Sequence, residues 1–325
     1  MIKNFTFVLL VVFLSGCSIK DTTGFWTSEK NLKKDEVNLK PLFNNKDKRL
    51  IKEFNNNYKI KLDSSLINSD NLGYLNNNDG YVTYKGNLKK ISKYNFSKIS
   101  NYNKLEPDLI FHNNGIIFFD NKGTILNFDI NSKLIWKKNN YFRNEKKLNP
   151  LLSMQSNKDY LIVADNLSKY YALRVDNGEI LWSKNHESPF NSQIKIYNDK
   201  FFIVDSNNDL NCFSIKDGSK IWSASTNKPF INSLKKISIV INNDLVIFNN
   251  SLGDIIAVNI ESGMLEWQIS TQNSDNLNEL INLKTSDLIL NENKIFFSNN
   301  KSIFYSIDSK TGNIIWRQQV KSNIK

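Results

Sequence analysis

The sequence predicts an all-β protein built from repeated antiparallel hairpins, and three observations lead to that fold class. Five of the six tryptophans end a similar short stretch, in which an apolar strand, a turn and a second strand follow one another. These tryptophans recur at intervals of 40 to 49 residues. In four of the five copies a glycine lies four residues before the tryptophan, at the turn. The tryptophans are Trp136, Trp182, Trp222, Trp267 and Trp316, and the glycines are Gly178, Gly218, Gly263 and Gly312.

Residues 170–182 show the pattern most clearly. An apolar segment reads as a strand, Asn177 and Gly178 form the predicted turn, and a second apolar segment ends at Trp182. A tight hairpin turn needs positive φ, which glycine adopts without a steric clash of Cβ. Ser132 stands in this position in the first copy. The residue ten positions before the tryptophan is small in most copies, namely Ala172, Cys212, Ala257 and Ser306, with Leu126 as the exception.

This period predicts a β-propeller of four-stranded antiparallel blades. Repeats in the forties with several short strands and a fixed tryptophan are typical of that fold. Each copy contains a further apolar strand before the motif, at 115–119, 160–164, 201–204, 245–248 and 294–297. The copies span about 107–140, 148–186, 189–226, 231–271 and 280–320, and a degenerate copy at 66–102 brings the visible blades to six. Residues 58–62 alternate in polarity and predict a lone strand that completes the last blade and closes the ring.

We interpret the tryptophans and glycines of the motif as structural rather than ligand-binding. Near the start of the outermost strand, an indole can cover a large apolar area and donate its N–H to a neighbouring backbone carbonyl. The glycine would let the tight turn aim that indole, and the small residue would let the inner strands approach closely.

The first 17 residues predict a lipoprotein export signal. Lys3 precedes a ten-residue apolar run at 5–14, which is too short for a bilayer-spanning helix of about 20 residues. The following Ser15, Gly16 and Cys17 look like the end of a bacterial lipobox, after which Cys17 would be lipidated; the alternative is an ordinary signal peptide with an incidental cysteine. Acylation with two or more chains suffices for stable anchoring. We therefore expect a signal at 1–17, a polar, lysine-rich tether at 18–54 and a propeller domain at 55–325.

Charge and cysteine content narrow the function further. The 325 residues carry a formal net charge of +11, but the lysines are scattered through predicted turns and strand ends. We therefore expect a solvated surface and no nucleic-acid partner. If Cys17 is lipidated, the remaining cysteine, Cys212, has no disulfide partner within the chain. Cys212 lies in the small-residue position and is expected to pack in the core, the alternative being a reactive or metal-binding thiol.

The motif resembles a known pattern. A small apolar residue, a polar pair and Gly-x-x-x-Trp at forty-odd spacing are similar to the pyrroloquinoline-quinone-type propeller repeat. Together with Cys17 and the tether, the repeats resemble the BamB family, lipoproteins of the outer-membrane β-barrel assembly machinery. The resemblance implies an eight-bladed propeller, a periplasmic position, contact with the periplasmic domains of the central barrel-insertase subunit, and neither catalysis nor cofactor. Ser18 after the cysteine favours the outer membrane, by analogy with enterobacterial sorting.

The sequence departs from that family in blade number. Six copies are visible, and eight blades would need roughly 360 residues beyond the tether, whereas 271 are present. Either the ring has fewer blades or the chain is shortened at its C-terminus. The family's partner-contacting loops share no residue motif with this chain, so none of their residues is carried over.

Two other functions remain open from the sequence. One is a quinone-dependent dehydrogenase, whose calcium and quinone would need carboxylates; Asp120, Asp165, Asp205 and Glu261 lie at separate predicted strand ends, and His112 and His186 have no companion at metal-ligand spacing. The other is an envelope lipoprotein that binds a glycan or peptide on the open propeller face. Residues 141–143 and 187–190, between repeats, would offer aromatic side chains for it, the alternative being packing between blades.

Overall fold

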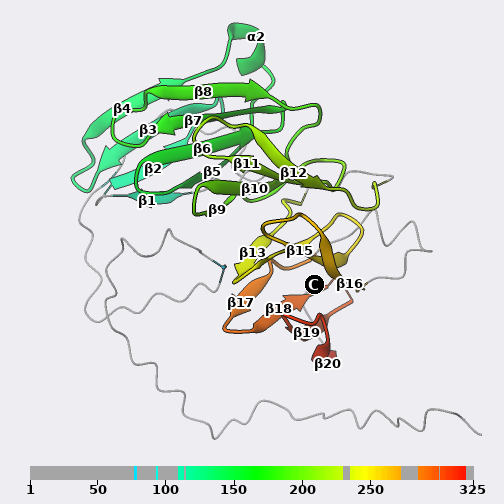
Figure 1. Ribbon diagram of the computed structural model, residues 1–325. Coiled ribbons are helices and arrows are strands. Elements are labelled where there is room, and N and C mark those ends of the chain that lie inside the picture. Colours follow the sequence, from blue (N-terminus) through cyan, green and yellow to red (C-terminus); the bar gives the residue numbers. More distant parts are fainter. Residues whose placement is uncertain are drawn as a thin grey trace, which may run out of the picture. The chain divides into compact units, whose positions relative to one another are not determined.

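The computed structural model describes residues 77–78, 93, 109–112, 115–229, 235–271, 285–299 and 301–319 (Figure 1). The chain divides into two units, Met1–Phe54 and Asn55–Lys325, and every described residue lies in the second. The predicted signal with Cys17, the tether, the strand at 58–62 and most of the degenerate copy at 66–102 lie outside the described residues. No helix in the described ranges has the length and apolarity that a membrane crossing needs.

The described strands form five sheets of four antiparallel strands each, which confirms the predicted propeller blades. Within every sheet the strands follow sequence order, so each blade is a meander. Blade 1 contains β1 (Ile110–His112), β2 (Gly115–Phe119), β3 (Thr124–Asp129) and β4 (Leu134–Asn139). Blade 2 contains β5 (Leu152–Ser156), β6 (Tyr160–Asp165), β7 (Lys169–Arg174) and β8 (Ile180–Asn185).

The remaining blades repeat this arrangement. Blade 3 contains β9 (Lys195–Tyr197), β10 (Lys200–Val204), β11 (Leu210–Ser214) and β12 (Lys220–Ala224). Blade 4 contains β13 (Ile239–Asn242), β14 (Leu245–Asn249), β15 (Asp254–Asn259) and β16 (Leu265–Ser270). Blade 5 contains β17 (Ile289–Asn291), β18 (Lys294–Ser298), β19 (Ile303–Asp308) and β20 (Ile314–Gln319). Between blades 1 and 2 lies the short helix α2 (Arg143–Lys146), which projects from the sheets in Figure 1.

Burial falls from the inner strands of a blade to the outer one. In β6 every residue after the first is buried, whereas β20 exposes all six of its residues. Because neighbouring blades cover both faces of the inner strands, these strands are near-continuous apolar runs rather than alternating ones. The fourth strand has one face towards solvent, and several of its apolar side chains are exposed there, among them Leu134, Ile180 and Ile314.

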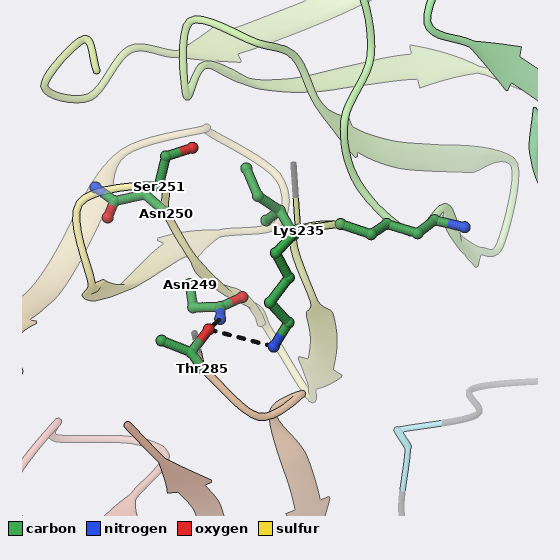
Figure 2. Close-up of a pocket in the computed structure, with 7 residues that line it drawn as sticks. Lys235, Asn249, Asn250, Ser251 and Thr285 are labelled. Atoms are coloured by element: carbon green, nitrogen blue, oxygen red, sulfur yellow. Dashed lines mark hydrogen bonds between the residues drawn. The ribbon is translucent and has the colours of Figure 1, made fainter. Parts of the chain in front are cut away.

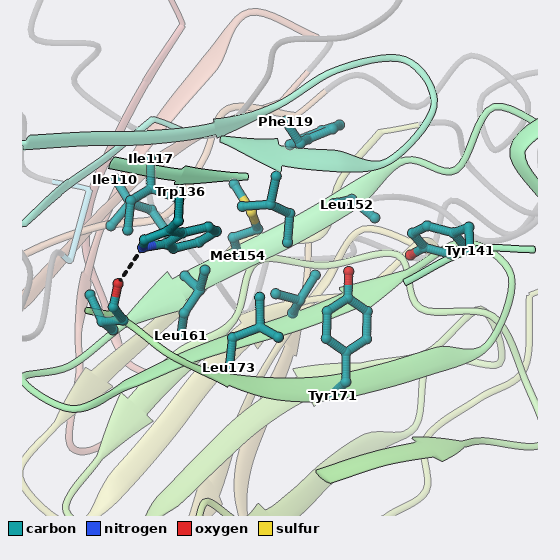
Figure 3. Packing of buried hydrophobic residues seen from close by; sticks show 13 residues of the cluster. Ile110, Ile117, Phe119, Trp136, Tyr141, Leu152, Met154, Leu161, Tyr171 and Leu173 are labelled. Atoms are coloured by element: carbon teal, nitrogen blue, oxygen red, sulfur yellow. Dashed lines mark hydrogen bonds between the residues drawn. The ribbon is translucent and has the colours of Figure 1, made fainter. Parts of the chain in front are cut away.

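Consecutive blades pack face to face through apolar side chains. Figure 3 shows the cluster between blades 1 and 2, in which Ile117, Phe119 and Trp136 meet Leu161 and Tyr171. Three further clusters join blade 2 to blade 3, blade 3 to blade 4 and blade 4 to blade 5. The first strands of successive blades, β1, β5, β9, β13 and β17, are neighbours in turn. They therefore form the inner edge of the stack.

Blade 1 and blade 5 each have one face with no described blade packed against it, and the apolar residues on these two faces differ in burial. On the face of blade 1 that points away from blade 2, Phe118, Leu126 and Phe128 form a buried cluster. On the face of blade 5 that points away from blade 4, the rings of Phe296, Phe304 and Trp316 contact one another, with centroids 5.5 to 6.4 Å apart. Trp316 is 41% exposed, more than any other described motif tryptophan.

A register shift precedes each motif tryptophan on the fourth strand. In blade 2, Ala172 faces Trp182 and Leu173 faces Ile180, so Leu181 is an extra residue. The other four blades have the same shift. An extra residue of this kind bends the strand and re-aims the adjacent side chain. The shift therefore turns the indole towards the next blade, a feature that the sequence pattern does not reveal.

Blade 1 corrects the predicted alignment of its small-residue position. Trp136 faces Asn127, nine residues earlier, while Leu126 faces Lys137. The cause is a shorter turn: the Asp129 N–H donates to the carbonyl of the residue four positions later, whereas the corresponding bond in blade 2 spans five positions. Leu126 is therefore no counterpart of Ala172, and it packs instead on the face away from blade 2.

Candidate functional site

The motif tryptophans of blades 1 to 4 each join a blade to the next one. The indole N–H of Trp136 donates to the backbone oxygen of Val175 over 2.8 Å (Figure 3). The equivalent bonds run from Trp182 to Ile215 at 2.8 Å, from Trp222 to Ile260 at 3.2 Å and from Trp267 to Ser309 at 3.2 Å. The predicted hydrogen bond from indole to backbone carbonyl is thus confirmed for these four residues, and each carbonyl belongs to the following blade.

The motif glycines lie against the tryptophan of the preceding blade. Gly178 has a φ of 69°, and a Cβ there would lie 2.7 Å from Cε3 of Trp136. The same relation holds between Gly218 and Trp182, Gly263 and Trp222, and Gly312 and Trp267. Glycine therefore meets two demands, the positive φ of the turn and the close approach of an indole. The sequence of one copy predicts the positive φ only, because the close approach involves a tryptophan of another copy.

Neighbouring blades are joined by a second contact besides the indole bond, and this joint involves the turn between the second and third strands of a blade. In blade 2, Asp165 Oδ1 accepts the backbone N–H groups of Leu167 and Lys169, both over 2.8 Å. Its other oxygen accepts the hydroxyl of Tyr141, which follows the last strand of blade 1. Burial raises the pKa of Tyr141 and also that of Asp165. The pair is therefore a polar contact enclosed within a packed joint.

Blade 3 repeats this joint with a histidine. His186 follows the last strand of blade 2, and its Nε2 lies 3.1 Å from Oδ2 of Asp205. Asp205 Oδ1 accepts the N–H groups of Asn207 and Asp209. The His186 ring stacks on Phe190, with centroids 5.0 Å apart. His186 thus has structural neighbours on both its polar and its apolar side.

The side chains considered for catalysis are distributed over separate blades. Asp120, Asp165 and Asp205 each accept backbone N–H groups of their own turn. Glu261 is exposed and pairs with Lys200. Across the part of the chain that the structure describes, no three His, Cys, Asp or Glu residues are placed to hold a metal ion. A calcium and quinone site built from these carboxylates therefore does not fit this arrangement.

Cys212 packs in the core between blades 3 and 4, as the sequence predicted. It has no exposed surface, and burial raises the pKa of its thiol to about 12. It faces Trp222 across the sheet, in the position that small residues take in other blades.

The aromatic residues between repeats divide into two groups. Tyr141 and Phe190 are each 5% exposed and pack inside the stack. Phe142 is 75% exposed, and Leu148 in the same connection is 63% exposed. The predicted exposed aromatic surface is therefore limited to Phe142 among these three side chains.

A small hollow lies before the start of β13 (Figure 2). Lys235 Nζ donates to Oγ1 of Thr285 over 3.3 Å, and Asn249 Nδ2 donates to the same oxygen over 3.0 Å. Burial lowers the pKa of Lys235. The hollow has room for roughly one water molecule, which excludes a cofactor there.

A contact at the inner edge of the blades was not predicted from the sequence. Asn77 and Asn78 hydrogen-bond to blades 3, 4 and 5, across sequence separations of 115 to 210 residues. No local pattern marks these two asparagines, because their partners are distant in the sequence.

Comparison with known proteins agrees with the repeat architecture. The family described as outer membrane protein assembly factor BamB matches residues 121–325, which is more than half of the chain. No curated protein matches the sequence. The crystal structure of BamB from Moraxella catarrhalis is similar at 16% identity and a TM-score of 0.50, over 66% of this chain and 63% of that one.

Two dehydrogenases share the same fold. A europium-containing methanol dehydrogenase is similar at 12% identity and a TM-score of 0.52, over 65% of this chain and 50% of that one. The quinohemoprotein alcohol dehydrogenase from Comamonas testosteroni is similar at 11% identity and a TM-score of 0.52, over 66% and 42%. The chain spans less than two thirds of the length of each of these three structures. At such identities the likeness concerns the fold alone.

Proposed function

This chain belongs to the family of the outer membrane protein assembly factor BamB, and we propose that it is a non-catalytic scaffold of the outer-membrane β-barrel assembly machinery. The observation that carries the proposal is the family match over residues 121–325, which covers nearly all of the five blades. The use of the candidate carboxylates as turn acceptors supports the non-catalytic part. The propeller presents its loops to the periplasmic domains of the barrel insertase and assists insertion of barrel proteins.

Anchoring by lipid at Cys17 is part of this proposal. The tether at 18–54 then holds the propeller on the periplasmic face of the outer membrane, where confinement beside a partner raises its effective concentration. Mass spectrometry of the mature protein tests the anchor. We expect an N-terminal peptide that begins at Cys17 and carries acyl chains; an unmodified peptide that begins elsewhere would contradict it.

The connections between blades are the proposed contact surface. Because strands alternate in direction, these connections emerge at the same end of the stack as the turns between second and third strands. Phe142 and Leu148, both exposed, lie in the connection between blades 1 and 2. We assign the contact to these two exposed apolar side chains as part of the proposal. Met264, which is 70% exposed, lies in the turn between β15 and β16 at the opposite end.

Cross-linking and capture of the full-length lipidated protein from native membranes test the scaffold. We expect recovery of the barrel-assembly subunits, weakened by the double variant Phe142→Ser and Leu148→Ser. The variant Met264→Ser is the matched control, since it removes an equally exposed apolar side chain from the other end. Recovery of a glycan or an unrelated peptide alone, with no assembly subunit, would favour an envelope ligand-binding lipoprotein instead.

A quinone-dependent dehydrogenase is the second candidate, because two dehydrogenases, one of them a quinohemoprotein, share the fold. Titration of the protein with calcium and pyrroloquinoline quinone separates the two functions. The scaffold predicts no saturable binding, whereas saturation in the micromolar range would favour the enzyme.

A further inference from the structure

Asn77 completes the open inner edge of blade 4. Its Oδ1 accepts the backbone N–H of Ile241 over 3.0 Å, and its Nδ2 donates to the backbone oxygen of Ile241 over 3.1 Å. Ile241 lies in β13, whose other edge pairs with β14. A side-chain amide carries the same donor and acceptor as a peptide group, so it can pair with a strand edge as another strand would.

Asn77 also reaches blade 5 through its own backbone. The N–H of Leu290 in β17 donates to the carbonyl of Asn77 over 3.1 Å. Ile241 is 3% exposed and Leu290 is 5% exposed, so both edges are enclosed where Asn77 meets them. The two strand edges therefore hold this one residue through three hydrogen bonds.

The side-chain amide nitrogen of Asn78 is surrounded by three oxygen atoms that can accept its hydrogen bonds. Its Nδ2 lies 2.9 Å from the backbone oxygen of Leu288, 3.0 Å from Ser238 Oγ and 3.2 Å from Gln193 Oε1. Lys195 Nζ lies 3.4 Å from its Oδ1. Ser238 and Leu288 have no exposed surface, and Lys195 is 5% exposed. The acceptors face the amide nitrogen and the cation faces the amide oxygen.

This arrangement distinguishes asparagine from aspartate, which has nearly the same shape. The carbonyl oxygens of Ile241 and Leu288 can only accept a hydrogen bond. A carboxylate in place of either amide would bring a second oxygen against them, in surroundings where an unpaired polar group is costly. Asn78 also has a φ of 61°, a conformation in which asparagine is enriched.

We propose that the inner edges of β13 and β17, together with Gln193, Lys195 and Ser238, form a peptide-binding site that selects asparagine. Asn77 and Asn78 occupy the site within the same chain. Its ligand class in another molecule is a peptide turn with two consecutive asparagines: the first pairs with β13 through its side-chain amide and with β17 through its carbonyl, and the second takes the left-handed conformation. Pairing with a strand edge while a side chain fills a pocket is an established mode of peptide recognition. The site does not depend on the proposed scaffold role.

Peptide binding to a vacated site tests the proposal. The full-length double variant Asn77→Ala and Asn78→Ala is titrated with a fluorescently labelled peptide of residues 72–83. We expect saturable binding to this variant and at least tenfold weaker binding to the unsubstituted protein, since the intramolecular pair competes at high effective concentration. A peptide with both asparagines replaced by aspartate should bind at least tenfold more weakly. Absence of binding to a folded variant, or equal binding of the aspartate peptide, would overturn the proposal.

Hydrogen exchange provides a second measurement that does not require the vacated variant to be stable. In Asn77→Asp we expect faster exchange at the amides of Ile241 and Leu290, which both donate to Asn77, with the amides of β15 unchanged. The matched control is Asn177→Asp, because Asn177 uses only its side-chain oxygen as an acceptor, for the Glu179 N–H. Unchanged exchange at Ile241 and Leu290 would overturn the proposal, as would the same acceleration in the control.

Discussion

Replacing Gly218 by alanine should destabilise the joint between blades 2 and 3. Gly218 has a φ of 67°, and a Cβ there would lie 2.6 Å from Cζ3 of Trp182. The left-handed conformation costs an L-residue about 1–2 kcal/mol. The indole must also move, which weakens its 2.8 Å hydrogen bond to Ile215, an interaction with a net value of about 0.5–1.5 kcal/mol. With lost packing included, we expect a fall of about 2–4 kcal/mol in the free energy of unfolding.

Urea denaturation followed by circular dichroism measures this change, and a second background identifies its cause. In Trp182→Leu, the six-membered ring that would meet the new methyl group is absent, so the added cost of Gly218→Ala should fall to the backbone part alone. Ser132→Gly is the matched control, because Ser132 holds a φ of 64° in the corresponding turn of blade 1. We expect that control to stay within about 1 kcal/mol of the unsubstituted protein.

Two results would refute the reasoning. One is a cost below about 1 kcal/mol for Gly218→Ala, since even the backbone conformation alone predicts that much. The other is an equal cost in the presence and absence of the Trp182 indole, because the close approach would then contribute nothing.

Three further predictions concern single residues. Tyr141→Phe removes the hydroxyl that donates to the buried Asp165, and we expect a loss of about 1–3 kcal/mol in urea denaturation; an effect no larger than that of the exposed control Phe142→Ala would contradict it. Cys212, whose pKa is raised to about 12, should be alkylated in the native protein at pH 8 far more slowly than in urea, as followed by peptide mass mapping; similar rates would disprove its enclosure. The pKa of Asp217 is lowered to about 2, first by the backbone N–H of Ser219 and then by the hydroxyl of that residue. Its ionised form therefore stabilises the fold above the ordinary value of 3.8, and this contribution is lost as the pH falls towards 2. Asp217→Asn should flatten the urea midpoint between pH 4 and pH 2, and parallel pH profiles for the two proteins would count against the assignment.

The sequence predicted those features that depend on short segments. The strands at 115–119 and 160–164 and the turn at Gly178 are encoded by local apolar runs and a residue that allows positive φ, so the five blades could be located before the structure was known. The strand register of blade 1 could not be predicted from the sequence. Its turn is one residue shorter, but the spacing from Ser132 to Trp136 is the same as in the other copies.

Contacts between different repeats could not be predicted from the sequence, for a different reason. The contact between Gly178 and Trp136 requires knowledge of which blade follows which in space, and a single copy does not carry it. Asn77 and Asn78 lie in an asparagine-rich stretch, so the local composition does not distinguish them from the other asparagines there. Their partners in three blades come together only once the inner strands are aligned.

The indole hydrogen bonds run from each blade to the blade that is synthesised after it. Each of the four described bonds reaches a carbonyl 33 to 42 residues later in the chain. A growing polypeptide that lengthens by about 5–20 residues per second therefore leaves its newest sheet without a cover for several seconds. During synthesis the apolar face of the newest blade therefore stays exposed to solvent until the following blade has been made.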